Sequence, residues 1–263
     1  MPELTIPMLA ALAYLGAVAV LVGRLRAGQP GGRASLALAA LGIALHAATH
    51  GLGWIRLQGP DLHFFAALSL VALGMAALVT VAATTERLEA LGVVVYPLAA
   101  LLALLYSVAG HGAPEALGWR LQLHAWLALL AYAALAVAAL LAVMLWFQER
   151  ALRRRQLHGW LRALPPLVQM ETLLFRSLGA SFVLLTLALV TGVVFVENLL
   201  AQHLWHKTVL SVLSWVVLGV LLFGRWRFGW RGPRAVTLTL TSMLLLGLAF
   251  FGSKYVLEML LQR

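Results

Sequence analysis

The chain has 263 residues, of which 63% are hydrophobic and only 11% are charged. Soluble globular domains carry roughly a quarter of charged residues, so this composition excludes a water-soluble fold and indicates a protein embedded in a bilayer. The formal net charge of +10 does not indicate a nucleic-acid surface, because the arginines fall in short loops beside apolar segments, where they act as topology signals.

Eight apolar segments, each near the length that crosses a bilayer, follow one another along the chain. The first is retained rather than cleaved as a signal peptide, because Glu3 precedes it and Arg24 and Arg26 follow it. The predicted fold is an all-α polytopic membrane helix bundle, formed by one integral membrane domain over residues 1–263. The predicted spans are 5–23, 34–54, 64–83, 91–109, 123–147, 174–196, 207–224 and 234–257.

Most of the 19 basic residues fall in loops on one side of these spans. The positive-inside rule places those loops in the cytoplasm and both termini outside it. With zero cysteines, the chain forms no disulfide and holds no thiolate metal site, so any redox thiols must belong to a partner.

The longest predicted cytoplasmic loop covers 148–173 and contains Arg153, Arg154 and Arg155. It has room for a surface helix. Its basic side chains are expected to contact anionic lipid headgroups, which favour each Lys or Arg by about 1 kcal/mol near the surface. The alternative function for this loop is a docking site for a soluble partner.

Histidine is the residue type that points to chemistry. Residues four apart share one face of a helix, so His46 and His50 form a stripe on the second span, with Gly42 one turn deeper. His124 opens the fifth span and His206 opens the seventh. Only His158 is predicted to be cytoplasmic, and the outer half or outer loops hold His46, His50, His63, His111, His124, His203 and His206.

Three predicted helices therefore offer imidazoles at a similar depth. Neutral imidazole is a ligand of haem iron, and two facing imidazoles form a six-coordinate b-type site. Small residues beside the ligands are expected to leave room for the macrocycle. Its propionates would pair with cations at the outer interface, and the candidates are Arg56, Arg120, Lys207 and Lys254. The edges of the ring would contact the outer tryptophans Trp54, Trp119, Trp126 and Trp205.

Structural alternatives remain open for the same residues. Histidines in membrane helices also hydrogen-bond neighbouring helices, and tryptophans form interfacial belts. A zinc site on His46 and His50 would need a third ligand, which the sequence does not offer at that depth. The only aspartate is Asp61, and the glutamates lie at span ends or in loops, which disfavours a cation or proton transporter.

Several stretches carry a family resemblance by their order and spacing. They are Ala44 to Ala47 around His46, Leu123 to Ala133 with His124 and Tyr132, Pro165 to Glu171, His206 to Trp215, Gly229 to Gly232, and Phe251 to Lys254. Together they resemble the cytochrome c assembly superfamily that includes CcsA and HemX, and most closely its YpjD-type inner-membrane proteins. The resemblance covers nearly the whole chain.

The resemblance implies an eight-span protein that handles haem for attachment to cytochrome c outside the cytoplasm. His124 matches a haem ligand of CcsA-type members, and His46 matches the second-span histidine of the YpjD-like branch. Two features of this chain differ from those of CcsA-type members. Gln202 to His206 stand where CcsA-type members have Trp-x-Trp-Asp, and no histidine follows the last span. The resemblance therefore implies an accessory haem-handling role rather than haem-lyase catalysis.

The sequence thus predicts a haem b-binding inner-membrane protein with His46 and His124 as iron ligands and His50 or His206 as substitutes. One alternative is a regulatory or scaffolding membrane protein, similar to HemX, that acts on haem-synthesis or cytochrome c assembly proteins through its basic cytoplasmic loop. A small-molecule or metal-ion transporter is a third, disfavoured by the missing midplane carboxylates.

Overall fold

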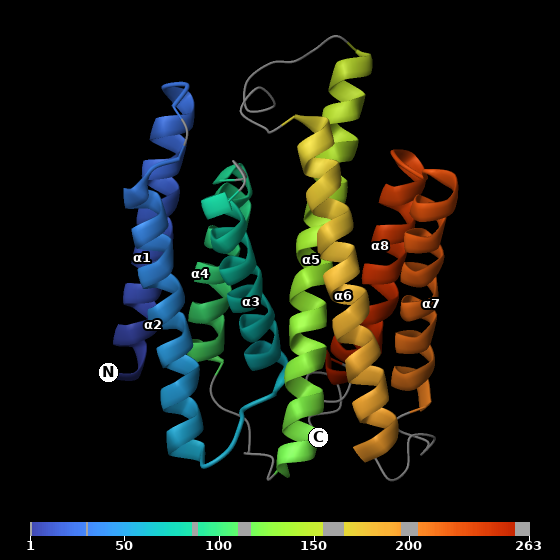
Figure 1. Cartoon of the computed structure of the whole chain (residues 1–263). Helices are drawn as coiled ribbons and strands as arrows, with labels where there is room; N and C mark the ends of the chain where they lie inside the picture. Colours follow the sequence, from blue (N-terminus) through green and yellow to red (C-terminus); the bar gives the residue numbers. More distant parts are fainter. Residues whose placement is uncertain are drawn as a thin grey trace. The chain divides into compact units, whose positions relative to one another are not determined.

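The structure is a computed structural model that describes residues 2–29, 31–85, 89–109, 117–154, 166–195 and 205–255. All regular secondary structure in these ranges is helical (Figure 1). Contacts group the helices into two compact units, where the sequence predicts one domain. Unit 1 contains α1 to α4, and unit 2 contains α5 to α8.

Within the described ranges, eight helices are long and apolar enough to cross a membrane, with mean hydropathy between 1.4 and 2.6 in their most apolar windows. This confirms the predicted eight-span all-α fold. The chain is a multi-pass membrane protein that contacts the lipid bilayer. The extracytoplasmic position of both termini stays a prediction from the distribution of arginine.

Unit 1 is built from antiparallel neighbours joined by short connections. Its elements are α1 (Pro2–Arg26), α2 (Arg33–Leu57), α3 (Phe64–Thr85), the 3-10 turn η1 (Glu89–Leu91) and α4 (Gly92–Val108). Helix α1 contacts α2 and α4, and α3 contacts the same two helices. Small side chains of α1 at helical spacing, Ala10, Ala13 and Ala17, are buried. They allow the close helix approach that stabilises membrane bundles.

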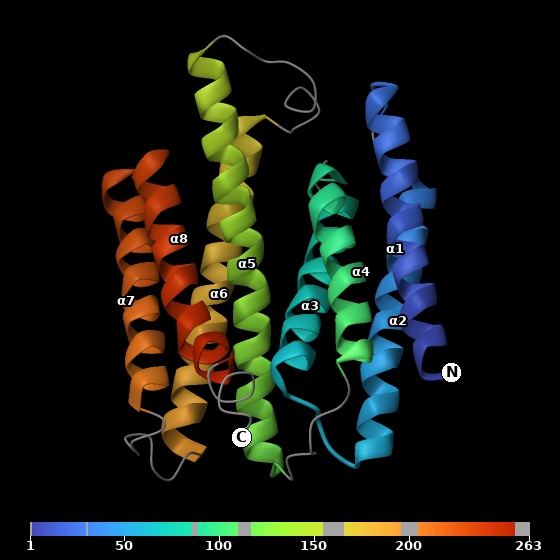
Figure 2. The same ribbon diagram turned by 180° about the vertical axis from the view of Figure 1, so that it is seen from behind.

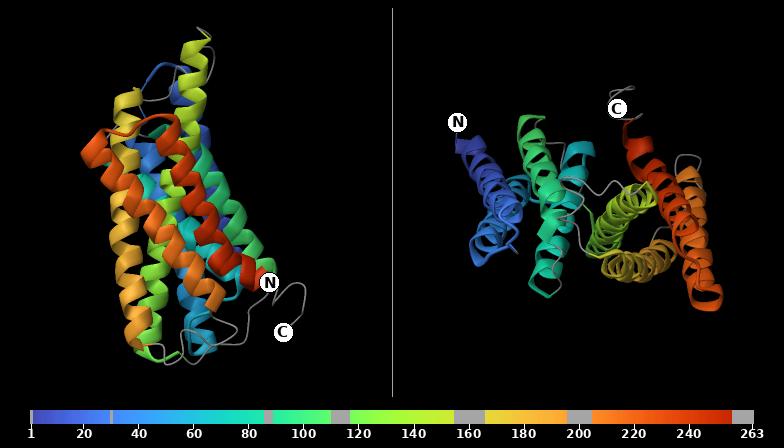
Figure 3. Two further views of the ribbon diagram at one scale, coloured as in Figure 1. Left: turned by 90° about the vertical axis from the view of Figure 1, so that its right-hand side faces the viewer. Right: turned by 90° about the horizontal axis from the view of Figure 1, so that it is seen from above.

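Unit 2 contains the longest of the described helices. Its elements are α5 (Trp119–Arg153), α6 (Leu167–Phe195), α7 (Trp205–Phe228), α8 (Pro233–Gly247) and the π-helical segment η3 (Leu248–Gly252). Helix α5 contacts α6 and α8, and α7 contacts the same two helices. Figure 2 shows α7 and α8 side by side, and Figure 3 shows this pair tilted against α5 and α6.

The helices α5 and α6 extend further than their apolar segments predict. Helix α5 continues to Arg153 instead of ending at residue 147, and α6 begins at Leu167 instead of 174. Hydropathy marks the membrane boundary, whereas Gln, Glu and Arg are good helix formers that let α5 continue into water. Both flanks of the predicted 148–173 loop are therefore helical, and residues 155–165, with His158, lie outside the described residues.

The end of α8 is tied to α5 through a tyrosine. The Tyr132 hydroxyl donates to the Leu246 carbonyl, just before η3, and the Tyr132 ring contacts Phe250 and Phe251 at centroid distances of 6.2 and 5.3 Å. A π-helical segment changes the carbonyl pairing of the turn before it, and a side-chain donor can satisfy the displaced group. This contact joins two of the stretches that carry the family resemblance.

Candidate functional site

The ring of His124 is held in one orientation by the backbone of α6. Its Nδ1 lies 2.8 Å from the Ala188 carbonyl oxygen. A carbonyl oxygen can only accept a hydrogen bond, so Nδ1 carries the proton and Nε2 keeps the lone pair of the neutral imidazole. This is the arrangement in which metal-binding histidines are commonly oriented, with one nitrogen donating to a carbonyl and the other left for the metal.

A glycine of α6 allows the His124 ring to approach. A Cβ atom added at Gly192 would lie 3.1 Å from His124 Cε1, tighter than ordinary van der Waals contact. The Thr191 hydroxyl lies 3.4 Å from His124 Nδ1 and donates to backbone carbonyls of its own helix. A segment of little more than one turn near the end of α6 thus forms the surface that positions this imidazole, and neither Ala188 nor Gly192 stood out in the sequence.

Other predicted residues lie at the same end of unit 2, which we call the His124 end. The antiparallel order of the helices brings together the first residues of α5, the first residues of α7 and the last described residues of the chain. His206 and Lys207 lie in the first turn of α7, and Lys254 follows η3 with its ammonium 5.5 Å from the Phe250 ring. The predicted Trp126 is half-buried on α5.

Arg120 lies one helical turn before His124, and so on the same face of α5. Its guanidinium lies 5.6 Å from the Trp119 ring and 5.8 Å from the Phe195 ring at the end of α6. The side chain is otherwise exposed. The His124 end therefore combines an oriented imidazole, a second histidine and three cations.

His46 is buried in unit 1 with 0% of its surface exposed. Its Nε2 lies 2.8 Å from the Ser69 hydroxyl of α3, and its Nδ1 lies 3.4 Å from the Tyr14 hydroxyl of α1. Both ring nitrogens thus face hydroxyl groups of neighbouring helices. His46 belongs to unit 1 and His124 to unit 2.

His50 shares the partner of His46, as the four-residue spacing predicts. Its Nε2 lies 3.0 Å from the same Ser69 hydroxyl, and its ring stacks on Tyr106 at a centroid distance of 4.4 Å. A serine hydroxyl has a single proton, so at least one of the two imidazoles donates to Ser69. All four helices of unit 1 contribute to this Ser69 network, which we define as Tyr14, His46, His50, Ser69 and Tyr106.

The space expected beside Gly42 is filled. A Cβ atom at Gly42 would lie 2.8 Å from Cδ1 of Tyr14, so the ring of Tyr14 occupies the space that was expected to accommodate a macrocycle. This expectation was wrong, because the glycine serves the close contact between α1 and α2. Glycine in a membrane helix commonly has this packing role.

A second polar group lies near the end of α2. Nδ1 of His63 lies 2.6 Å from the carboxylate of Asp61, whose residue is only 7% exposed, and the His63 and Tyr106 rings are 5.8 Å apart. The carboxylate of Asp61 also interacts with Tyr106. The only aspartate of the chain therefore anchors the connection between α2 and α3.

The remaining predicted residues are placed as follows. Arg56 lies exposed in the last turn of α2, Trp54 lies two residues earlier, and Trp205 is exposed at the start of α7. Among the residues that the structure describes, no group of three or more His, Cys, Asp or Glu side chains gathers at metal-binding distance. His111 and His203 lie outside the described residues.

Comparison with known proteins gives a family and several relatives. The family described as cytochrome C assembly protein matches residues 33–261. The inner membrane protein YpjD of Escherichia coli K12 is 37% identical over 137 residues, which is 52% of this chain and 52% of that protein. A relative from Azospirillum brasilense, an uncharacterized 28.8 kDa protein in the nifR3-like 5' region, is 40% identical over 152 residues, or 57% of this chain and 55% of the relative.

The chain spans about half the length of the curated relatives it matches. No solved structure matches it. The family match begins at the first residue of α2 and includes all of unit 2 that the structure describes, with both His46 and His124 inside it. Because this match covers most of the chain, the protein belongs to the cytochrome c assembly protein family.

Proposed function

We propose that this protein binds haem b in the bacterial inner membrane and handles it on the outer side for cytochrome c assembly, with His124 as an iron ligand. Membership of the cytochrome c assembly family supports haem as the ligand. The printed name of the Escherichia coli relative supports the inner membrane as the location. The observation that carries the proposal is the His124 ring, whose Nδ1–H donates to Ala188 and whose Nε2 keeps its lone pair.

The residues of the His124 end fit a haem group in their chemistry. A neutral, oriented imidazole suits the iron. Arg120, Lys207 and Lys254 are cations at the same end and suit carboxylate propionates. When bound, haem would supply an iron that changes between the ferric and ferrous states. The protein residues would bind and orient the group, which is an accessory role.

A second iron ligand would come from His46, His50 or His206. His206 shares the His124 end of unit 2. His46 and His50 would have to exchange the Ser69 hydroxyl for iron, because Nε2 of each already faces it. The geometry therefore favours His206 as the partner of His124, and the family resemblance favours His46.

The optical spectrum of the purified protein tests the proposal directly. After expression in cells supplied with haem precursors, the protein in mild detergent is expected to show a Soret band that shifts when dithionite is added. Pyridine haemochrome analysis then gives the haem-to-protein ratio. A folded protein that stays colourless, even after incubation with hemin, would contradict the proposal.

Replacing Gly192 by alanine is expected to weaken haem binding about tenfold, the lower end of the effects seen when the orienting shell of a metal ligand is disturbed. The new Cβ would lie 3.1 Å from His124 Cε1 and push the ring away from the Ala188 carbonyl. Hemin titration followed at the Soret maximum measures the change. Gly179 of the same helix has no atom within 4 Å of an added Cβ, so Gly179→Ala is the matched control and should bind normally. Equal affinities for the two variants would argue against His124 as a ligand.

A further inference from the structure

The opposite end of unit 2 contains a partly buried set of charges that the proposed function does not use. Glu171 of α6 accepts from Arg225 of α7 at 2.8 Å, and Nε of Arg231 lies 3.5 Å from the same carboxylate oxygen. The Arg225 guanidinium also lies 4.5 Å from the Phe175 ring centroid. Two guanidinium groups thus share one carboxylate. The excess positive charge belongs to Arg231, whose side chain is 67% exposed.

The turn between α7 and α8 places Arg231 beside Glu171. Gly229 and Gly232 adopt positive φ values of 66° and 56°, which other residues rarely adopt. Between them, the Trp230 ring packs directly on Gly224, where any Cβ atom would overlap it. The family-like stretches Pro165 to Glu171 and Gly229 to Gly232 therefore meet at this ion pair.

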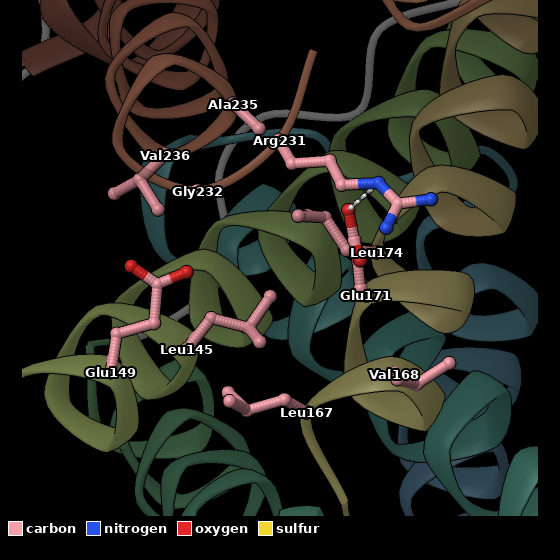
Figure 4. Close-up of a pocket in the computed structure, with 10 residues that line it drawn as sticks. All are labelled: Leu145, Glu149, Leu167, Val168, Glu171, Leu174, Arg231, Gly232, Ala235 and Val236. Atoms are coloured by element: carbon pink, nitrogen blue, oxygen red, sulfur yellow. Dashed lines mark ion pairs between the residues drawn. The ribbon is translucent and has the colours of Figure 1, made fainter. Parts of the chain in front are cut away.

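A pocket of about 160 Å³ opens beside the ion pair (Figure 4). Arg231 and Glu171 form one wall. The other lining side chains come from α5, α6 and α8 and are mostly apolar: Leu145, Leu167, Val168, Leu174, Ala235 and Val236. Val168 is 73% exposed and forms the rim. The pocket thus joins a positively charged group to an apolar surface at the ends of membrane-spanning helices.

A second charge of opposite sign lines the same pocket. Glu149 of α5 is half-buried, and its carboxylate points toward Gly232, 3.3 Å from where a Cβ atom would lie (Figure 4). Among the residues that the structure describes, no basic side chain lies within ion-pair distance of Glu149. A half-buried carboxylate in an apolar lining favours a cationic partner.

We propose that this pocket binds the headgroup of a phospholipid that carries a phosphate and a primary ammonium, as phosphatidylethanolamine does. The phosphate would pair with the guanidinium of Arg231, and the ammonium with the carboxylate of Glu149. The first part of the acyl chains would lie on the apolar wall at Leu145, Val168 and Val236. The site lies where the spans α5, α6 and α8 leave the apolar layer, which is the depth of lipid headgroups.

The two charges predict a defined selectivity among lipids. A primary ammonium has N–H donors for a carboxylate, whereas the quaternary ammonium of phosphatidylcholine has none. Phosphatidylglycerol offers the phosphate to Arg231 but brings no cation to Glu149. Its phosphate would also approach the Glu149 carboxylate, and that repulsion lowers its affinity. The expected order is therefore phosphatidylethanolamine first, with the other two lipids weaker.

A simpler role for Glu149 gives a different result. The carboxylate lies beside the first turn of α8, and negative charge near a helix N-terminus stabilises the helix. In that case Glu149→Gln lowers the melting temperature and leaves lipid selectivity unchanged. Lipid selectivity is therefore the readout that separates the two roles.

Native mass spectrometry of the full-length protein in detergent tests the proposal. The protein is titrated with phosphatidylethanolamine, phosphatidylcholine and phosphatidylglycerol that have the same acyl chains. Glu149→Gln is expected to lower phosphatidylethanolamine affinity about tenfold and remove its advantage over phosphatidylglycerol, the size of effect that one charge-assisted hydrogen bond gives. Arg231→Gln is expected to weaken the binding of phosphatidylethanolamine and of phosphatidylglycerol. Arg227→Gln, an arginine of the same helix end that does not line the pocket, is the matched control.

One further variant makes the result decisive. Val168→Trp fills the pocket from its exposed rim without removing a charge, and it should reduce binding of all three lipids. If the unmodified protein shows no preference for phosphatidylethanolamine, or if Glu149→Gln keeps that preference, the proposal is wrong. The test does not depend on haem, because the Soret band of each variant is measured separately and is expected to stay unchanged.

Discussion

His124→Gly is expected to remove the Soret band of the purified protein, and added imidazole is expected to restore it. The substitution removes the imidazole that is proposed to ligate iron. It leaves a space beside Gly192 that free imidazole can enter. Restoration separates ligation from folding, because an unfolded protein would not recover a defined spectrum. The measurement is an absorption spectrum in the ferric and ferrous states before and after addition of imidazole.

The same spectra identify the second ligand. Loss of one of two axial imidazoles converts a six-coordinate haem to a five-coordinate one, which changes the visible bands without removing the Soret band. His206→Ala is expected to give that change, since His206 shares the His124 end of unit 2. His46→Ala and His50→Ala are the comparison variants. A His124→Gly protein that retains its full Soret band would contradict the proposal for His124.

The fold was predictable because one physical quantity, apolar length, sets the number of spans. Each of the eight predicted segments corresponds to a described helix. The ends of α5 and α6 were not predictable in the same way, since a helix that leaves the bilayer continues as long as its polar residues favour helix. Hydropathy therefore gives the membrane boundary, and Arg153 and Leu167 show that the helix boundary is a separate property.

The site was predictable in part. The four-residue spacing of His46 and His50 correctly predicts that they share a face, and they share Ser69. Ser69 and Tyr14 were missed, although each is one of very few polar residues in a strongly apolar segment, and that isolation was the available signal. Gly42 was misinterpreted, because sequence alone does not say which side chain occupies the space beside a glycine.

Some contacts depend on residues far apart in the chain. His124 finds its acceptor 64 residues away, at Ala188, and Glu171 finds Arg225 54 residues away. A backbone carbonyl has no sequence signature, so the orientation of His124 became visible only in the folded helix pair. From the sequence, Arg231 was interpreted as a topology signal and Glu149 as a residue at the end of a span. The turn at Gly229 and Gly232 brings both side chains to one pocket.

Ser69→Ala is expected to lower the free energy of unfolding by about 2 kcal/mol. Its hydroxyl is a partner of two buried or half-buried imidazoles, and the loss of a partner leaves a buried polar group unsatisfied at a cost of about 1–3 kcal/mol. Hydrogen bonds in membrane proteins are worth about 0.6 kcal/mol on average, up to about 1.7, so two such bonds give a range of about 1.2 to 3.4 kcal/mol that includes this value. Unfolding in sodium dodecyl sulfate, followed by circular dichroism, measures it. Ser107→Ala is the matched control, since that hydroxyl bonds only the Ala103 carbonyl of its own helix.

The haem content of the Ser69→Ala protein then decides the role of His46. If His46 holds unit 1 together, the variant is less stable and its haem-to-protein ratio is unchanged, which is the result we expect from a ring with both nitrogens engaged and no exposed surface. If His46 instead leaves Ser69 to bind iron, the hydrogen bond competes with ligation, and its removal raises haem affinity. A rise of about tenfold corresponds to the release of about 1.4 kcal/mol and would assign His46 to the iron together with His124.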